Sequence, residues 1–152
     1  DDAQAIAIRA GLWLLLISCG IGLGITVAGE WNLAAGRSPE IWGRAGVLKY
    51  PHGAVLHALQ TLPFLAMLMR KVRVHHSALL MKSAVAAHVL ILGHAVWQTC
   101  HGRSRMDLDY TSGICLSASV VLMLIPVVAV IRQLVIHDLV RLRVEHEIRI
   151  SR

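Results

Sequence analysis

An almost uninterrupted apolar run occupies residues 111–136 and has the sequence TSGICLSASVVLMLIPVVAVIRQLVI. Its one charged residue, Arg132, lies near the end of the run, where a long side chain reaches the lipid head groups while its stem stays in hydrocarbon. About 20 apolar residues are needed to cross the ~30 Å hydrocarbon core of a bilayer as an α-helix. The run therefore predicts a transmembrane helix over residues 111–136, with Pro126 inside it.

Three further apolar runs precede this one, at residues 10–28, 54–69 and 77–99. The run at 54–69 is short, and we expect Pro63 to kink it, because proline lacks an N–H and its ring crowds the preceding turn. The sequence thus predicts an all-α, integral membrane bundle of about four transmembrane helices within residues 1–136. The charged segment 137–152 is expected to follow as a helical cytoplasmic tail.

The composition favours a membrane protein and argues against a nucleic-acid-binding protein. Hydrophobic residues make up 56% of the 152 residues and charged residues 16%, whereas soluble domains average about 45–50% and about 25%. The net charge is +6, but one Phe and two Tyr offer few rings on which bases could stack. We therefore expect the lipid bilayer, and other membrane helices or subunits, as partners.

The distribution of Lys and Arg predicts the orientation of the four helices. Ten of the fifteen basic residues would lie on the side that carries both ends of the chain, and five on the other side. Cytoplasmic loops carry the excess of Lys and Arg. The sequence therefore predicts a multi-pass membrane protein with both termini in the cytoplasm, and we call the opposite face of the bilayer the outer face.

Nine histidines are a high number for a membrane protein of this length, and they sort by their depth in the predicted helices. Four lie in a predicted turn or in the tail and are expected to be ordinary interfacial residues: His75, His76, His137 and His146. Four others lie at the outer ends of two neighbouring antiparallel helices: His52, His57, His94 and His101. The ninth, His88, lies mid-helix and is expected to be a core histidine with satisfied nitrogens.

Two polar stripes predict a site at the outer face. Gln60 follows His57 at three residues, and Gln98 follows His94 at four, so each pair shares one helix face. Counted at 1.5 Å per residue, His57 and His94 both lie roughly 6–8 Å inside the membrane. We predict that His57, Gln60, His94 and Gln98 face one another as a cofactor site. The alternative is a hydrogen-bond network that ties two helices together.

The residue types leave several ligands open for this site. Paired histidines on facing helices suit the axial positions of haem b, which would imply electron transfer. A transition metal would need three or four ligands, which His52, His57, His94 and His101 could supply. His and Gln also suit a quinone or a lipid head group. The alternatives to a redox role are a non-catalytic membrane subunit and a proton-responsive membrane protein.

Small and thiol side chains near the same face add two expectations. Gly20 and Gly24 form a small-xxx-small pair, which lets another helix approach closely. Cys100 and Cys115 flank one outer loop, so either a disulfide or free thiols would fit, and Cys19 lies near the same level.

One run resembles a known group of proteins. Residues 49–63, KYPHGAVLHALQTLP, are followed a helix later by Trp97-Gln98 and Gly102. This pattern is similar to an H-x4-HAxQ-x-LP signature in a group of uncharacterised bacterial multi-pass membrane proteins. In that group further membrane helices precede the matched part, so the resemblance implies a fragment or a divergent short form. It implies a location in the bacterial inner membrane and no activity. The matching positions are His52, His57, Gln60, Pro63, Trp97 and Gln98.

Overall fold

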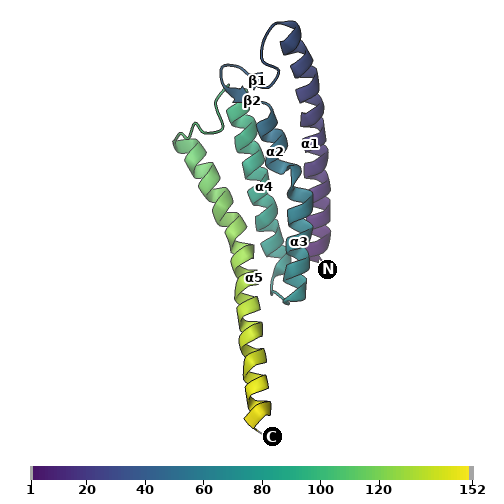
Figure 1. Ribbon diagram of the computed structural model, residues 1–152, viewed down its shortest axis with the longest axis vertical. Coiled ribbons are helices and arrows are strands. Elements are labelled where there is room, and N and C mark those ends of the chain that lie inside the picture. The colour runs from purple at the N-terminus through teal and green to yellow at the C-terminus, as the bar shows by residue number, and fades with distance from the viewer. Residues whose placement is uncertain (1, 151–152) are drawn as a thin grey trace.

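The computed structural model describes residues 2–150, which form a helical bundle with a short hairpin at one end (Figure 1). The elements follow the order α1 (Asp2–Ala34), β1 (Ile41–Trp42), β2 (Gly46–Val47), α2 (Lys49–Leu56), α3 (Ala58–Lys71), α4 (Ser77–Cys100) and α5 (Tyr110–Ile150). The predicted all-helical architecture is confirmed, apart from the two-residue strands.

Four helical segments are long and apolar enough to cross a membrane, as predicted: Asp2–Ala34, Lys49–Lys71, Ser77–Cys100 and Tyr110–His137. The first begins eight residues before the predicted start at residue 10. Ala3 and Ala7, which lie ahead of the apolar run, are buried in the core and pack these extra residues, about two turns of helix, against the bundle. Both ends of the described chain lie at the same end of the bundle (Figure 1).

The second candidate span is two helices rather than one kinked helix, and the break lies at His57 instead of Pro63. His57 has φ −87° and ψ −2°, which ends α2 and begins α3. Its carbonyl accepts the backbone N–H groups of Gln60 and Thr61, each at 2.9 Å, and the Thr61 hydroxyl at 3.1 Å. Pro63 lies inside α3. The helix therefore restarts at His57, and the proline is taken up in its second turn.

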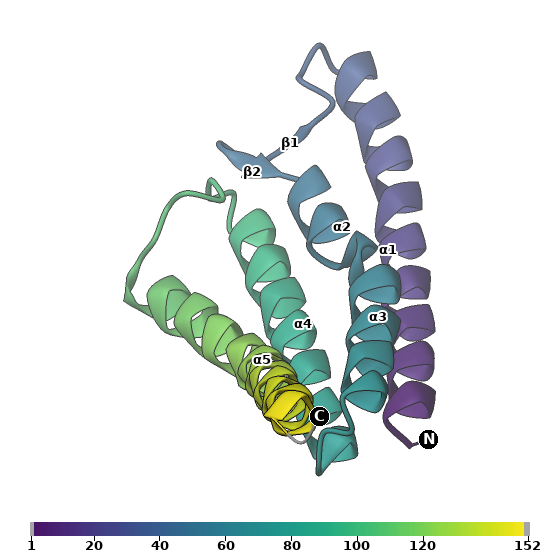
Figure 2. The same cartoon turned by 60° about the horizontal axis from the view of Figure 1, so that its bottom comes forward.

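A hairpin covers the end of the bundle opposite the two chain ends (Figure 2). Its strands pair antiparallel, with Trp42 opposite Gly46. A Cβ on Gly46 would lie 2.3 Å from the Trp42 carbonyl oxygen and 2.8 Å from that of Thr99, so only glycine fits there. The Ala45 N–H donates to the carbonyl of Gly102, which has φ +62° after the end of α4. The hairpin is thus fixed to the end of α4, and we call this the hairpin end.

The core lies between α1, α3 and α4 and consists of small and aliphatic side chains. Its buried members are Ala3, Ala7, Leu14, Val55, Ala58, Leu62, Leu65, Ala66, Met69, Met81, Ala84 and Val130. Small residues let helices approach closely where lipid removes most of the hydrophobic drive for packing. At the closest approach, a Cβ on Gly11 of α1 would lie 3.0 Å from the Cα of Leu59 in α3.

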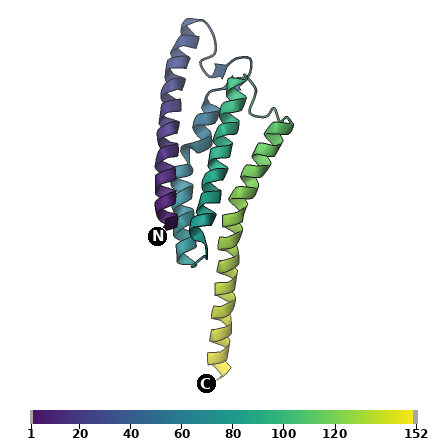
Figure 3. The ribbon, with the colours of Figure 1, turned by 180° about the vertical axis from the view of Figure 1, so that it is seen from behind.

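Helix α5 packs against α4 and diverges from it toward the hairpin end (Figure 3). Pro126 lies inside α5 without ending it. The helix continues past the predicted boundary at residue 136 as far as Ile150, so the charged tail is helical as expected. This extension reaches beyond the other helices (Figure 3).

Candidate functional site

The polar residues of the predicted site take partners different from those expected. His52 bonds to α1: its Nδ1 lies 2.9 Å from the carbonyl oxygen of Ser18 and 3.1 Å from the Ser18 hydroxyl. A carbonyl only accepts, so Nδ1 carries the proton. The Ser18 hydroxyl in turn donates to the His52 carbonyl at 3.2 Å. Gly22 leaves room for the imidazole, since a Cβ there would lie 3.3 Å from its Cε1. His52 therefore ties α2 to α1.

His57 and Gln60 are brought together, and no hydrogen bond among the described residues joins either side chain to α4. The His57 Nδ1 lies 3.1 Å from Gln60 Oε1, and both side chains are exposed. The residue of α3 that does reach α4 is Thr61, whose hydroxyl lies 3.1 Å from Nε2 of His88. The depth count that placed His57 opposite His94 assumed an unbroken helix. The break at His57 removes that assumption.

His88 behaves as a satisfied core histidine. It is buried, its Nδ1 donates to the Ala84 carbonyl at 3.0 Å, and its Nε2 meets the Thr61 hydroxyl. Both ring nitrogens thus have a polar neighbour, and the Thr61 hydroxyl shares its one proton between Nε2 and the His57 carbonyl. The contact joins α3 to α4.

His94 is the one predicted site histidine that is both buried and left with an unpartnered ring nitrogen. The side chain is 4% exposed, and Nδ1 lies 3.1 Å from the Tyr50 hydroxyl. The two rings meet edge to face at 6.0 Å between centroids. Nε2 is buried and has no hydrogen-bond partner. The Tyr50 side chain thus contacts this imidazole through both its hydroxyl and its ring and orients it.

Gln98 lies one turn beyond His94 on the same face of α4, as predicted. It is 0% exposed. Its Nε2 donates to the Asp107 carbonyl at 2.7 Å, while Oε1 is buried without a partner. Nearly all buried polar atoms in native proteins find a partner. His94 and Gln98 therefore hold one ring nitrogen and one amide oxygen that are buried without a hydrogen-bond partner, a turn apart on α4.

A cavity of about 240 Å³ lies between α4 and the diverging start of α5. Its walls are Gly93, His94, Trp97, Thr111, Ser112 and Cys115. Nε2 of His94 thus belongs to a side chain that lines an open space. We call this space the α4–α5 cavity.

Asp109 caps the N-terminus of α5 beside this cavity. The Ser112 N–H donates to its carboxylate at 2.8 Å, which is the geometry of a helix N-cap. This bond, the nearby Ser112 hydroxyl and the ion pair with Arg103 lower the pKa of Asp109 from 3.8 to about 2. The Ser112 hydroxyl lies near enough to contribute, although it makes no hydrogen bond of good geometry.

The four histidines proposed as metal ligands do not converge. His101 stacks on Trp97 at 3.9 Å between centroids and bonds to the Trp97 carbonyl through Nδ1. His52, His57 and His94 bond to three different elements, as described above. Among the side chains that the structure describes, no group of three or more His, Cys, Asp or Glu residues is arranged to hold a metal ion. Cys19, Cys100 and Cys115 are free thiols.

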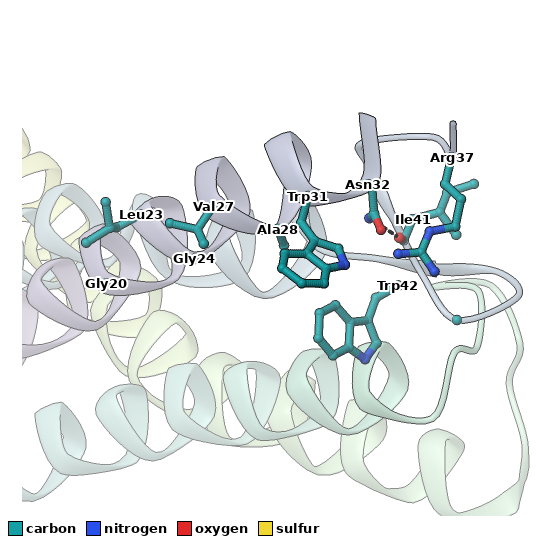
Figure 4. Close-up of a pocket in the computed structure, with 11 residues that line it drawn as sticks. Gly20, Leu23, Gly24, Val27, Ala28, Trp31, Asn32, Arg37, Ile41 and Trp42 are labelled. Atoms are coloured by element: carbon teal, nitrogen blue, oxygen red, sulfur yellow. Dashed lines mark hydrogen bonds between the residues drawn. The ribbon is translucent and has the colours of Figure 1, made fainter. Parts of the chain in front are cut away.

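A second, larger hollow was missed by the sequence reasoning. It is a groove of about 810 Å³ between the second half of α1 and the hairpin (Figure 4). Gly20 and Gly24, expected to pack against a helix, line this groove, and a Cβ on either would meet nothing within 4 Å. The sequence feature that could have indicated this groove is the spacing of Gly20 and Gly24 ahead of Trp31.

Comparison with protein-family models, with curated proteins and with solved structures gave no match to this chain.

Proposed function

We propose that this chain is a multi-pass protein of the bacterial inner membrane that binds the ring head group of a quinone or quinol in the α4–α5 cavity, through His94. The observation that carries the proposal is the buried, unpartnered Nε2 of His94, held in place by Tyr50 on the wall of that cavity.

Insertion in a bilayer is supported by the large apolar side chains that every candidate span leaves uncovered. Leu23, Phe64, Leu79 and Val121, one from each span, are between 57% and 69% exposed. In water each exposed apolar Å² costs about 25 cal/mol, whereas hydrocarbon removes this cost. The excess of Lys and Arg on the side of the chain ends supports a cytoplasmic location for both.

The Tyr50–His94 pair suits a ligand that exists in carbonyl and hydroxyl forms. When the Tyr50 hydroxyl donates to Nδ1, the neutral imidazole carries its proton on Nε2 and donates to a carbonyl. When Nδ1–H donates to the Tyr50 oxygen instead, Nε2 offers a lone pair to a hydroxyl. A quinone presents the carbonyl and a quinol the hydroxyl. One site thus accepts both forms by exchanging tautomers.

The size and position of the cavity support a head group with its tail in the lipid. Pockets for whole drug-sized ligands occupy about 300–1,000 Å³, and this cavity, of about 240 Å³, is smaller. His94 lies six residues before the end of α4, which is about 9 Å along the helix axis. Nε2 is itself covered, so a membrane-soluble ring that enters the cavity sideways from the bilayer must first displace the atoms over it.

Haem b or a metal, expected from the histidine count, receives less support. Both need further ligands beside His94, and the other three site histidines are bonded elsewhere. The helix-tying alternative is favoured for two other histidines, because His52 joins α2 to α1 and His88 joins α4 to α3. His94 differs from these two histidines because its Nε2 has no hydrogen-bond partner.

The test is an organic extract of the protein purified in mild detergent, analysed by chromatography for quinones. The absorption spectrum and metal content of the same sample are measured beside it. We expect bound quinone and no Soret band. His94→Ala should lower the affinity for added quinone about fivefold, the value of one hydrogen bond of about 1 kcal/mol.

His57→Ala is the matched control, because His57 is exposed and outside the cavity, and it should retain the wild-type affinity. A Soret band or a stoichiometric metal that disappears with His94→Ala would overturn the quinone proposal in favour of haem or metal. A protein that neither retains quinone nor binds it on addition would also contradict the proposal.

A further inference from the structure

The groove along α1 changes character from one end to the other. Gly20, Gly24 and Ala28 follow one another at one per turn and form a flat floor, bordered by Leu23 and Val27. From Gly20 to Trp31 this floor extends roughly 16 Å along the helix axis, at 1.5 Å per residue. The inner part of the groove is therefore a long, narrow apolar surface at membrane depth.

The other end of the groove is aromatic and cationic. Trp31 of α1 and Trp42 of β1 line this end together with Arg37 (Figure 4). Indole rings are typical of the head-group level of a bilayer. The Lys49 ammonium forms an ion pair with the Glu40 carboxylate, and no described carboxylate pairs with Arg37. Arg37 is exposed, so its guanidinium is available to an anion at the head-group level that the indoles mark.

The wall opposite α1 is held at a fixed distance. The Asn32 side chain donates to the Ile41 carbonyl at 3.2 Å, and Pro39 packs where a Cβ on Gly29 would lie 3.6 Å from its Cβ. A second helix would have to displace the two indoles that stand in the groove. A single flexible acyl chain needs less room than a helix.

We propose that this groove binds one anionic phospholipid of the surrounding bilayer, with its phosphate on Arg37 and one acyl chain over Gly20 and Gly24 between Trp31 and Trp42. The guanidinium matches a phosphate in charge and in its paired donors. The glycine floor gives the chain room that any larger side chain would fill. This site is separate from the α4–α5 cavity, so it stands or falls independently of quinone binding.

The test is native mass spectrometry of the detergent-purified, delipidated chain, with dioleoyl phosphatidylglycerol or dioleoyl phosphatidylcholine added back at equal concentration. We expect one retained phosphatidylglycerol and a preference for it over phosphatidylcholine. Arg37→Gln should reduce that preference about tenfold, because it removes a charged hydrogen bond. Gly24→Leu should reduce the retention of both lipids, because the leucine fills the floor.

Arg44→Gln is the control, since Arg44 belongs to the same connection and does not line the groove. It should leave the preference unchanged, and circular dichroism checks that all variants keep wild-type helicity. Equal retention of the two lipids, or an unchanged preference in Arg37→Gln, would overturn the proposal. So would displacement of the lipid by inorganic phosphate alone, or a dimer that Gly24→Leu dissociates while lipid retention stays the same.

Discussion

At the scale of single residues, the molecule separates histidines that hold helices together from the one that faces a cavity. His52 and His88 each donate the Nδ1 proton to a backbone carbonyl of a helix, which leaves the ring little freedom to turn. His94 bonds to a hydroxyl, which can donate or accept. The sequence predicted His94 and Gln98 as site residues but did not indicate Tyr50. No spacing rule joins residues 50 and 94, because the contact depends on how α2 packs on α4.

Asp109 gives a prediction at the same scale, because its lowered pKa makes the start of α5 sensitive to acid. The folded pKa of about 2 lies below the ordinary 3.8, so the stabilisation is present above about pH 4 and is lost as the pH falls toward 2. Hydrogen exchange at the Ser112 amide, expressed as a protection factor, should fall over that range in the wild type.

Asp109→Asn keeps a good N-cap without a titrating group. Its protection factor at Ser112 should therefore be independent of pH between 2 and 5. Equal protection of the wild-type amide at the two ends of this range would contradict the capping role of the carboxylate.

At the scale of elements, the contact between α1 and α3 depends on the absence of a side chain at Gly11. Gly11→Val would place a Cβ 3.0 Å from the Leu59 Cα, a backbone atom beside the break at His57. We expect a loss of about 1–3 kcal/mol in the free energy of unfolding, measured by titration from mild detergent into dodecyl sulfate.

Gly20→Val is the matched control on the same helix, because a Cβ at Gly20 meets nothing within 4 Å. Both changes put the same side chain in place of glycine in α1, so helix propensity cancels in the comparison. Equal destabilisation by the two variants would show that α1 does not pack closely on α3 at residue 11.

The elements also show how far the sequence could predict the fold. Apolar length alone indicated the four long helices, because crossing a bilayer demands it. The hairpin was missed, since its two-residue strands depend on Gly46 fitting against Thr99 and Gly102, more than fifty residues away. The sequence predicted a kink at Pro63, because proline is the residue that locally disfavours a helix. The structure breaks the helix at His57 instead, and the hydrogen bonds to the His57 carbonyl form only when the next turn has folded.

At the scale of the whole molecule, the two hollows lie on different sides of the hairpin end. The groove is formed by α1 and the hairpin, and the cavity by α4 and α5. Each has an apolar wall and polar groups without a partner among the described residues: Arg37 at the groove, and His94 and Ser112 at the cavity. We infer that this end of the bundle is where the protein meets small membrane molecules, while α5 extends from the other end.

The most direct test of the central claim follows the imidazole nitrogens by ¹⁵N NMR, in detergent-solubilised protein labelled at histidine, while a short-chain quinone is added. We predict that one pair of ring signals shifts, that His94→Ala removes this pair, and that Tyr50→Phe alters its tautomer before any ligand is added. Shifts confined to exposed histidines such as His57, or none at saturating quinone, would contradict a head-group site at His94.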